Sequence, residues 1–178
     1  MKKVIIITTS LRENSNSDIL AERFGAGAAS AGNEVEIVSL KGKEIGFCRG
    51  CFACQKTGRC VINDDANEIT DKIAAADVVV WASPIYYYEM SGQMKTMIDR
   101  ANSLFSRERK FKDVYLLATA DDADASTPEG ALKGLKGWIR CMTGARLAGS
   151  VFVGGVETAG AIKDNVGLND AFELGGKI

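Results

Sequence analysis

The sequence predicts an α/β protein with a doubly wound parallel sheet, and three observations support this class. Short, unbroken runs of β-branched and aliphatic residues recur along the chain, as expected for parallel strands that are covered on both faces. Segments with apolar residues at helical spacing lie between these runs. Strands and helices therefore alternate, which favours a parallel sheet with right-handed crossovers and helices on both faces.

Each expected element has its own local signal. The strands are expected at the apolar runs 4–8, 35–40, 77–82, 114–119 and 149–153. Helical spacing recurs from 20 to 28, from 66 to 76, from 94 to 105 and from 132 to 142, and a short helix is expected near 171–174. Asp65 followed by Glu68 resembles a capping box, and Pro128 is suited to a first helical position.

Composition limits the classes of function. The 178 residues suit one domain, 1–178, and the net charge of -1 indicates no basic face for nucleic acid. No apolar run approaches the ~20 residues of a membrane span, and the N-terminal run is too short for a signal peptide. We therefore expect a cytoplasmic protein with no membrane partner. The absence of histidine excludes a Ser-His-Asp triad and a His-ligated metal.

The turn at 10–17, SLRENSNS, predicts an anion site. It joins the first expected strand to the first expected helix, where backbone N–H groups and the helix dipole favour negative charge. Ser10, Ser15, Asn16 and Ser17 add short donors, and Arg12 adds a charged fork suited to phosphate. The turn is neither a Walker A loop nor a GxGxxG fingerprint, and its donors favour a monophosphate. An N-cap role for Ser15 with a solvated Arg12 is the structural alternative.

Two further loops follow expected strands and so lie at the same edge of the sheet. The segment 83–91 begins with Ser83 and Pro84 and crowds apolar and aromatic surface where a flat ring can stack, although core or interface positions are the alternative for its tyrosines. The segment 119–126 is acidic and can border a ligand through backbone groups. Paired carboxylates for acid/base chemistry are its alternative interpretation.

Four of the five cysteines lie within thirteen residues, in CRGCFACQKTGRC. Cys48, Cys51, Cys54 and Cys60 have the spacing C-x2-C-x2-C-x5-C, and the first three resemble the compact run of bacterial ferredoxins. Structural zinc usually uses two separated knuckles, so zinc fits less well. A redox switch and a substrate-facing lid stay open as alternatives. Cys141 is expected to be a partly buried free thiol.

These motifs together resemble the flavodoxin-like NAD(P)H-dependent FMN reductases, including their iron-sulfur flavoprotein branch. The likeness covers about the first 120 residues well and the tail more loosely, through Gly154 and Gly155. The family's usual proline in the first loop is Leu11 here. The residues that carry the likeness are Ser10, Leu11, Arg12, Asn14, Asn16, Ser17, Asp64, Asp65, Ser83, Pro84, Ile85, Tyr86, Ser91, Lys95, Ile98, Asp99 and Arg100.

The resemblance implies a flavodoxin-like fold with five strands in the order 2-1-3-4-5 and FMN at the switch point between strands one and three. It implies that the family's cysteine-rich insertion follows the second strand, with Cys48, Cys51, Cys54 and Cys60 as ligands of a four-iron, four-sulfur cluster. The residues that the resemblance assigns to FMN are Ser10, Arg12, Asn14, Ser15, Asn16, Ser17, Ser83, Pro84, Ile85, Tyr86, Tyr87, Thr119 and Ala120.

The resemblance also implies the chemistry. A nicotinamide would pass hydride to the flavin, which would reduce a small acceptor such as a flavin or quinone, so no catalytic side chain is expected. An electron carrier between redox proteins, flavodoxin-like or iron-sulfur, is the alternative. The net charge of -1 disfavours it, because carriers commonly have a strongly charged surface. A homodimer or homotetramer is expected from the family.

Overall fold

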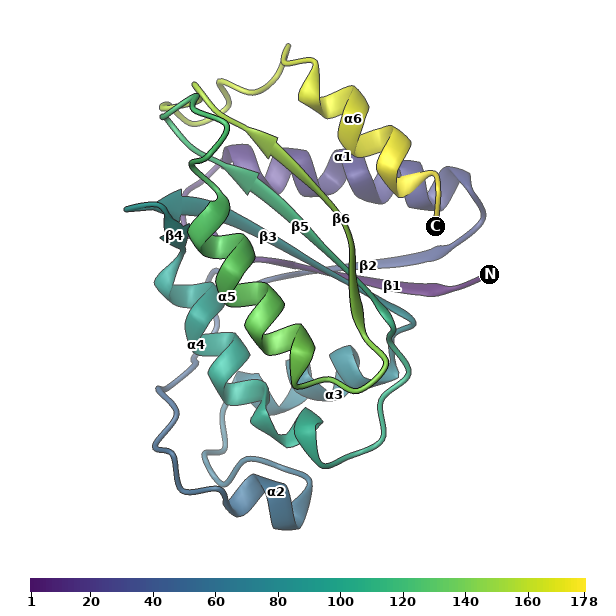
Figure 1. The fold of residues 1–178 in the computed structure, drawn as a ribbon, viewed down its shortest axis with the longest axis vertical. Coiled ribbons are helices and arrows are strands. Elements are labelled where there is room, and N and C mark those ends of the chain that lie inside the picture. Colours follow the sequence, from purple (N-terminus) through teal and green to yellow (C-terminus); the bar gives the residue numbers. More distant parts are fainter.

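Five parallel strands form the centre of the molecule in the computed structural model, which describes residues 1–178 (Figure 1). The strands point the same way because helices or loops return the chain across the sheet between them. In chain order the elements are β1 (Lys3–Thr8), α1 (Asn16–Ser30), β2 (Glu34–Ser39), α2 (Ala53–Thr57), α3 (Asp65–Ala75), β3 (Val78–Tyr86), β4 (Glu89–Met90), α4 (Gly92–Arg100), the 3-10 helix η1 (Ala101–Phe105), β5 (Asp113–Thr119), α5 (Glu129–Arg140), β6 (Arg146–Val153) and α6 (Gly167–Gly175).

The sheet has six strands, so the predicted number of five is wrong. The parallel strands run in the order β2-β1-β3-β5-β6, and the two-residue strand β4 pairs antiparallel with the end of β3. The sequence offered no separate apolar run for β4, because it is only the return of a hairpin that begins in β3. The α/β class, the parallel sheet and the doubly wound arrangement are confirmed.

Helices cover both faces of the sheet, as Figure 1 shows. On one face, α1 and α6 pack over a cluster that includes Leu20, Phe24 and Ala171. On the other face, α3, α4 and α5 pack over a larger cluster that includes Ile73, Met94 and Leu135. Both clusters take alternate residues of the same strands. This explains why the inner strands β1, β3 and β5 are apolar at nearly every buried position.

Glycines allow α1 and α6 to approach closely. A Cβ atom on Gly27 would collide with the backbone of Phe172, and one on Gly175 would collide with the backbone of Phe24. The contact between the two helices therefore depends on glycine on each side. It holds α6 against α1 on one face of the sheet, and the chain before α6 passes the carboxyl ends of the strands.

Several element boundaries differ from the predictions. β3 continues to Tyr86 because Ser83 and Pro84 stay paired with β5, so the start of the predicted loop 83–91 is strand. The N-cap of α3 is Asp64, whose side chain accepts from Ala66 N, and not the predicted Asp65. The cysteine-rich segment contains the short helix α2, which was not predicted. No helix of the structure is both long enough and apolar enough to span a lipid bilayer.

Candidate flavin site and cysteine cavity

A cavity of about 330 Å³ opens at the carboxyl ends of β1, β3 and β5. This edge is where ligands bind in doubly wound sheets, at the point where the strand order reverses. Most of the predicted FMN residues come together here. The cavity is lined by Ser10, Arg12, Ser15, Asn16, Ser17, Pro84, Ile85, Tyr86, Thr119, Ala120, Asp121, Val156 and Glu157.

The turn between β1 and α1 supplies the polar wall. Ser15 is the N-cap of α1, and its hydroxyl accepts from Asp18 N at 3.1 Å. Ser10, Ser15 and Ser17 are buried against the cavity, so their hydroxyls are held close to the unpaired N–H groups of the helix start. Asn14 has φ of 50°, a left-handed conformation that asparagine tolerates, and it does not line the cavity.

The segment after β6 closes this site from the other side. Asn16 Nδ2 donates to the carbonyls of Val156 and Thr158, both at 2.9 Å, and Asn16 Oδ1 accepts from Ile162 N. Arg12 Nη1 donates to the Glu157 carbonyl at 3.0 Å. The Asn16 side chain is thus a structural link and leaves only its backbone N–H for a ligand. Val156 and Glu157 were missed, because a glycine-rich tail gives no signal for its place in the fold.

The end of β3 supplies the apolar wall. Pro84, Ile85 and Tyr86 line the cavity, whereas Ser83 is fully buried and its hydroxyl donates to the Pro84 carbonyl at 2.8 Å. Tyr87 is fully exposed and lies in the hairpin between β3 and β4, where it borders a second cavity of about 390 Å³. That neighbouring cavity shares Ile85, Tyr86, Ala120 and Asp121 with the first. The two hollows are therefore adjacent.

Thr127 is a residue of this site that sequence reasoning missed. It borders the second cavity, its side chain is 2% exposed, and its hydroxyl has no hydrogen-bond partner. A buried hydroxyl without a partner is unfavourable unless a ligand satisfies it.

On the rim of the second cavity, the nearby Asp122 carboxylate raises the pKa of Tyr88 above its ordinary value.

The combination of groups suits FMN. The polar wall offers hydroxyls, helix N–H groups and Arg12 for a phosphate, and the apolar wall offers Pro84, Ile85 and Tyr86 for a flat ring. Thr127, whose hydroxyl has no partner, borders the same hollow as Ile85 and Tyr86. The residues present therefore fit a flavin mononucleotide.

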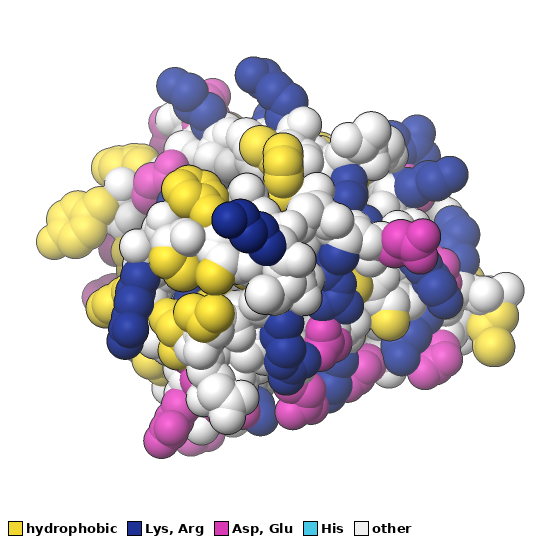
Figure 2. Space-filling model, turned by 90° about the horizontal axis from the view of Figure 1, so that it is seen from below, with side chains coloured by type: hydrophobic (Ala, Val, Ile, Leu, Met, Phe, Trp, Pro, Cys, Tyr) yellow, Lys and Arg dark blue, Asp and Glu magenta, His cyan; other side chains and the backbone are white.

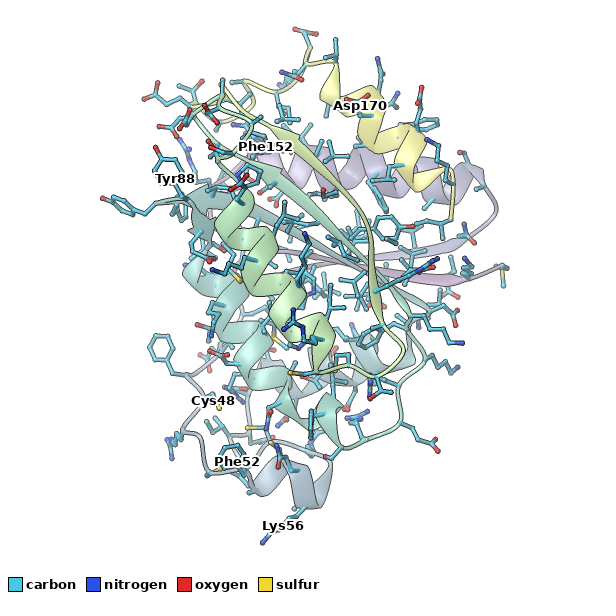
Figure 3. The ribbon with its side chains drawn as sticks, in the orientation of Figure 1. Cys48, Phe52, Lys56, Tyr88, Phe152 and Asp170 are labelled. Atoms are coloured by element: carbon cyan, nitrogen blue, oxygen red, sulfur yellow. The ribbon has the colours of Figure 1, made fainter.

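The cysteines lie in a different part of the molecule. A cavity of about 660 Å³ between the cysteine-rich segment, α4 and α5 is lined by all five cysteines. It shares no lining residue with the flavin cavity, and Figure 3 shows Cys48 far from Tyr88 along the long axis. Cys54 is buried and Cys60 half-buried, while Cys48, Cys51 and Cys141 are exposed. Cys141 was expected to be partly buried, which is wrong, because it lies at the exposed C-cap of α5.

All five thiols are free, and no three metal-ligating side chains of the structure are close enough to hold one metal ion. A single ion needs its sulfurs around one point, at about 2.3 Å. A four-iron cluster binds each thiolate to a different iron, so its sulfurs stand further apart. The donor chemistry of Cys48, Cys51, Cys54 and Cys60 on one cavity fits a cluster better than it fits zinc.

A buried ion pair holds the base of the cysteine-rich segment. Arg100, at the end of α4, donates to both carboxylate oxygens of Asp64 at 2.6 and 2.7 Å, and its side chain is wholly buried. Burial would raise the pKa of Asp64, but the hydrogen bonds from Arg100 and Gly46 outweigh it and keep that pKa below its usual value. The carboxylate therefore stays charged and anchors this corner.

The fold and the first cavity together define a class, namely a flavodoxin-like protein with an anion-binding turn beside an aromatic wall. The chain belongs to the NADPH-dependent FMN reductase family, whose model matches residues 2–157. The protein is accordingly an oxidoreductase of the FMN-dependent, NAD(P)H-using kind. The resemblance noted in the sequence is confirmed.

Known proteins resemble the chain in sequence and in fold. It is 32% identical over 183 residues to an iron-sulfur flavoprotein of Archaeoglobus fulgidus, a match that covers 99% of this chain and 78% of that one. It is 38% identical over 102 residues to an iron-sulfur flavoprotein of Methanocaldococcus jannaschii, covering 57% of this chain and 53% of the relative. The structure superposes on an azoreductase from Bacillus anthracis with a TM-score of 0.74 and 19% identity, each chain covered in full.

Proposed function

We propose that this chain binds FMN at the carboxyl edge of its sheet and catalyses electron transfer from NAD(P)H to a small acceptor, such as a free flavin or a quinone. The observation that carries the proposal is the meeting of a phosphate-type turn and an apolar wall in one cavity. The flavin, when bound, supplies the chemistry of accepting hydride from the nicotinamide and passing electrons on.

The chain's own residues are proposed to bind and orient the FMN. Ser10, Ser15, Ser17 and the start of α1 would hold the phosphate, and the exposed Arg12 would add its charge. Pro84, Ile85 and Tyr86 line the cavity with rigid apolar surface that would pack against the ring. The hairpin with Tyr87 and Tyr88 stands beside the outer cavity, where a nicotinamide or an acceptor can enter. No side chain is proposed as an acid, base or nucleophile.

Purification and a turnover assay test this function. The protein is expected to carry flavin with its characteristic absorption, and to oxidise NADH or NADPH when a quinone or free flavin is supplied. Release of the cofactor and its chromatography distinguish FMN from FAD. A preparation that binds no flavin, even after incubation with FMN, would contradict the proposal.

A second candidate function is electron transfer through an iron-sulfur cluster, with a redox protein as partner. Two findings favour it. The four cysteines of the compact run border one cavity, and both relatives described above bear the name iron-sulfur flavoprotein. We propose that Cys48, Cys51, Cys54 and Cys60 ligate a four-iron, four-sulfur cluster there. Anaerobic purification followed by iron and acid-labile sulfide counts tests it, and flavin without iron would leave the simple reductase.

We also propose that residues 1–178 act as one domain and associate as a homodimer or homotetramer near the flavin. Support comes from the surface around the outer cavity, where Tyr87 is fully exposed and Tyr86 and Tyr88 are 49% and 61% exposed. Three adjacent exposed aromatic residues are typical of a contact surface. Light scattering of the purified protein gives the oligomeric state directly, and a monomer would contradict this part.

A further inference from the structure

We propose that Arg100 and Asn102 are positioning residues for the cysteine cavity, which direct N–H groups at the sulfurs of Cys60 and Cys54. The inference rests on the second candidate function, because it assigns these residues to the binding of a thiolate-ligated cluster. Neither residue belongs to the compact cysteine motif. They come from the end of α4 and from η1, on the opposite wall of the cavity.

Arg100 closes the cysteine-rich segment at both of its ends. Nη1 donates to the Gly46 carbonyl at 2.7 Å, and Nη2 donates to the Ile62 carbonyl at 3.1 Å. Asp64, the partner of Arg100, also accepts from Gly46 N at 2.9 Å. One guanidinium thus ties the residues just before Cys48 and just after Cys60, so the segment between them is a closed loop.

The same guanidinium has one N–H group left without a partner. Arg100 and Cys60 line the same cavity, and their side chains are neighbours there. Arg100 lines the cavity and is 2% exposed, yet its Nε has no hydrogen-bond partner. A buried charged group with an unused donor is costly unless an acceptor is present, and a cluster sulfur is such an acceptor.

Asn67 fixes the backbone of Cys60. Its Oδ1 accepts from Cys60 N at 3.2 Å, and its Nδ2 donates to the Cys60 carbonyl at 3.2 Å and to the Ile62 carbonyl at 2.9 Å. Asn67 is buried on α3, so this grip is rigid. Cys60 is therefore held from two sides, through its backbone by Asn67 and beside its sulfur by Arg100.

Asn102 acts on the sulfur of Cys54 directly. Its Nδ2 donates to Cys54 Sγ at 3.3 Å, and Cys54 is the only buried thiol of the chain. Across the cavity, Gly50 N donates to Cys48 Sγ at 3.5 Å. Hydrogen bonds to ligating sulfurs and nearby positive charge stabilise the more negative, reduced state of a cluster, and so raise its potential.

Figure 2 shows the face that carries α2, where hydrophobic side chains lie among many Lys and Arg side chains. Most of these cations are exposed and hydrated, so they act on the cavity weakly. Arg100 differs from Arg49 and Lys56, which are exposed, because it is desolvated against the cavity wall. The structure thus singles out Arg100 among the cations of this region as the one built into the site.

The test compares the Asn102→Ala variant with the parent protein and with an Asn169→Ala control. Asn169 is an exposed residue of α6 on the opposite face of the sheet. Each protein is purified anaerobically, and its flavin, iron and sulfide contents, its cluster midpoint potential and its rate of iron loss to a chelator are measured. We expect Asn102→Ala to keep its flavin, to have a more negative midpoint potential, and to lose iron about tenfold faster.

Arg100→Gln, with the exposed Arg140→Gln as its control, is expected to lower the midpoint potential further. If Arg100→Gln fails to fold, the Asn102→Ala measurements still test the positioning role. A folded, flavin-containing Asn102→Ala protein that holds no iron supports the positioning role. An unchanged potential and an unchanged rate of iron loss would overturn it. A parent protein without iron would contradict the cluster itself, and the inference with it.

Discussion

The flavin cavity and the cysteine cavity are held together in different ways. The flavin cavity is bordered by the ends of β1, β3 and β5, which are neighbours in one hydrogen-bonded sheet. The cysteine cavity is bordered by a segment with one short helix, whose place depends on Arg100, Asp64 and Asn67. Backbone pairing thus fixes the first site, and a few buried polar side chains fix the second.

This difference predicts how the two sites respond to change. In the flavin cavity a single side chain can be removed without moving the strands, so substitutions should alter the affinity for FMN more than they alter the fold. In the cysteine cavity each anchoring residue serves several backbone groups at once. Substitutions there should move the segment as well as the ligand, because no sheet restores it.

The largest effect is expected from removing one of the four cysteines proposed as cluster ligands. Cys54→Ser should strongly lower the iron and sulfide content, since it removes the one buried thiolate of the four proposed ligands. Flavin content should be unchanged, because the two cavities share no lining residue. Absorption spectra with iron and sulfide counts of the anaerobically purified protein give both results.

Cys141→Ser is the matched control, because Cys141 borders the same cavity but lies on α5, outside the compact run. It should keep iron and sulfide at the parental amount. Loss of iron in this variant, or its retention in Cys54→Ser, would show that the ligand set differs from the predicted four. Loss of flavin in Cys54→Ser would contradict the view that the two sites are independent.

The second effect concerns the anchoring pair. Asp64→Asn should destabilise the protein by about 3 kcal/mol at neutral pH, because it leaves Arg100 buried without its counterion. Urea unfolding measures this, with the exposed Asp164→Asn as control. An Asp64→Asn variant as stable as the parent would contradict the view that this pair holds the segment.

The sign of the pH dependence follows from the pKa of Asp64, which the fold holds below its ordinary 3.8. A carboxylate with a lowered pKa stabilises the protein above its unfolded pKa, and this contribution is lost as the pH falls through the folded value. The stability difference between the parent and Asp64→Asn should therefore be full at neutral pH and shrink below about pH 3.8. A difference that grows on acidification would contradict the ion pair as its cause.

The fold was predictable because strands buried on both faces form continuous apolar runs, which can be recognised in the sequence without knowledge of the tertiary structure. Val4–Ile7 and Val78–Ala82 are such runs, and both are central strands. β4 was not predictable, since two residues of a hairpin have no period of their own. The end of β3 was mistaken for a loop because Pro84 is a turn signal, yet its pairing with Thr119 keeps it in the sheet.

The site residues also fall into a predictable and an unpredictable group. Residues next to a strand end in sequence, such as Ser10, Tyr86 and Ala120, were predicted and do line the cavity. Glu157 and Thr127 were missed, because only tertiary structure carries them to the cavity. The roles of Arg100 and Asn102 were missed for this reason too, since their partners lie 36 to 54 residues away in the chain.

The third prediction concerns the flavin cavity. Arg12→Ala should weaken FMN binding by about 1.5 kcal/mol, or about tenfold, because the exposed Arg12 is proposed to donate a charged hydrogen bond to the phosphate. Titration of the flavin-free protein with FMN measures it. The iron content should not change. A wild-type affinity would assign Arg12 solely to its contact with the Glu157 carbonyl.

The smallest expected effect is that of Thr127→Val on stability. Its sign, compared with and without FMN, distinguishes a flavin contact of Thr127 from a purely structural role. Thr127→Val replaces a buried, unpartnered hydroxyl with a methyl group of similar size. In the flavin-free protein this should increase stability slightly, because an unsatisfied buried group is removed. In the flavin complex it should cost about 1 kcal/mol, or about fivefold in affinity, because the ligand loses a hydrogen bond. Thermal unfolding with and without FMN measures both, and a shift in the same direction in both states would exclude Thr127 as a flavin contact.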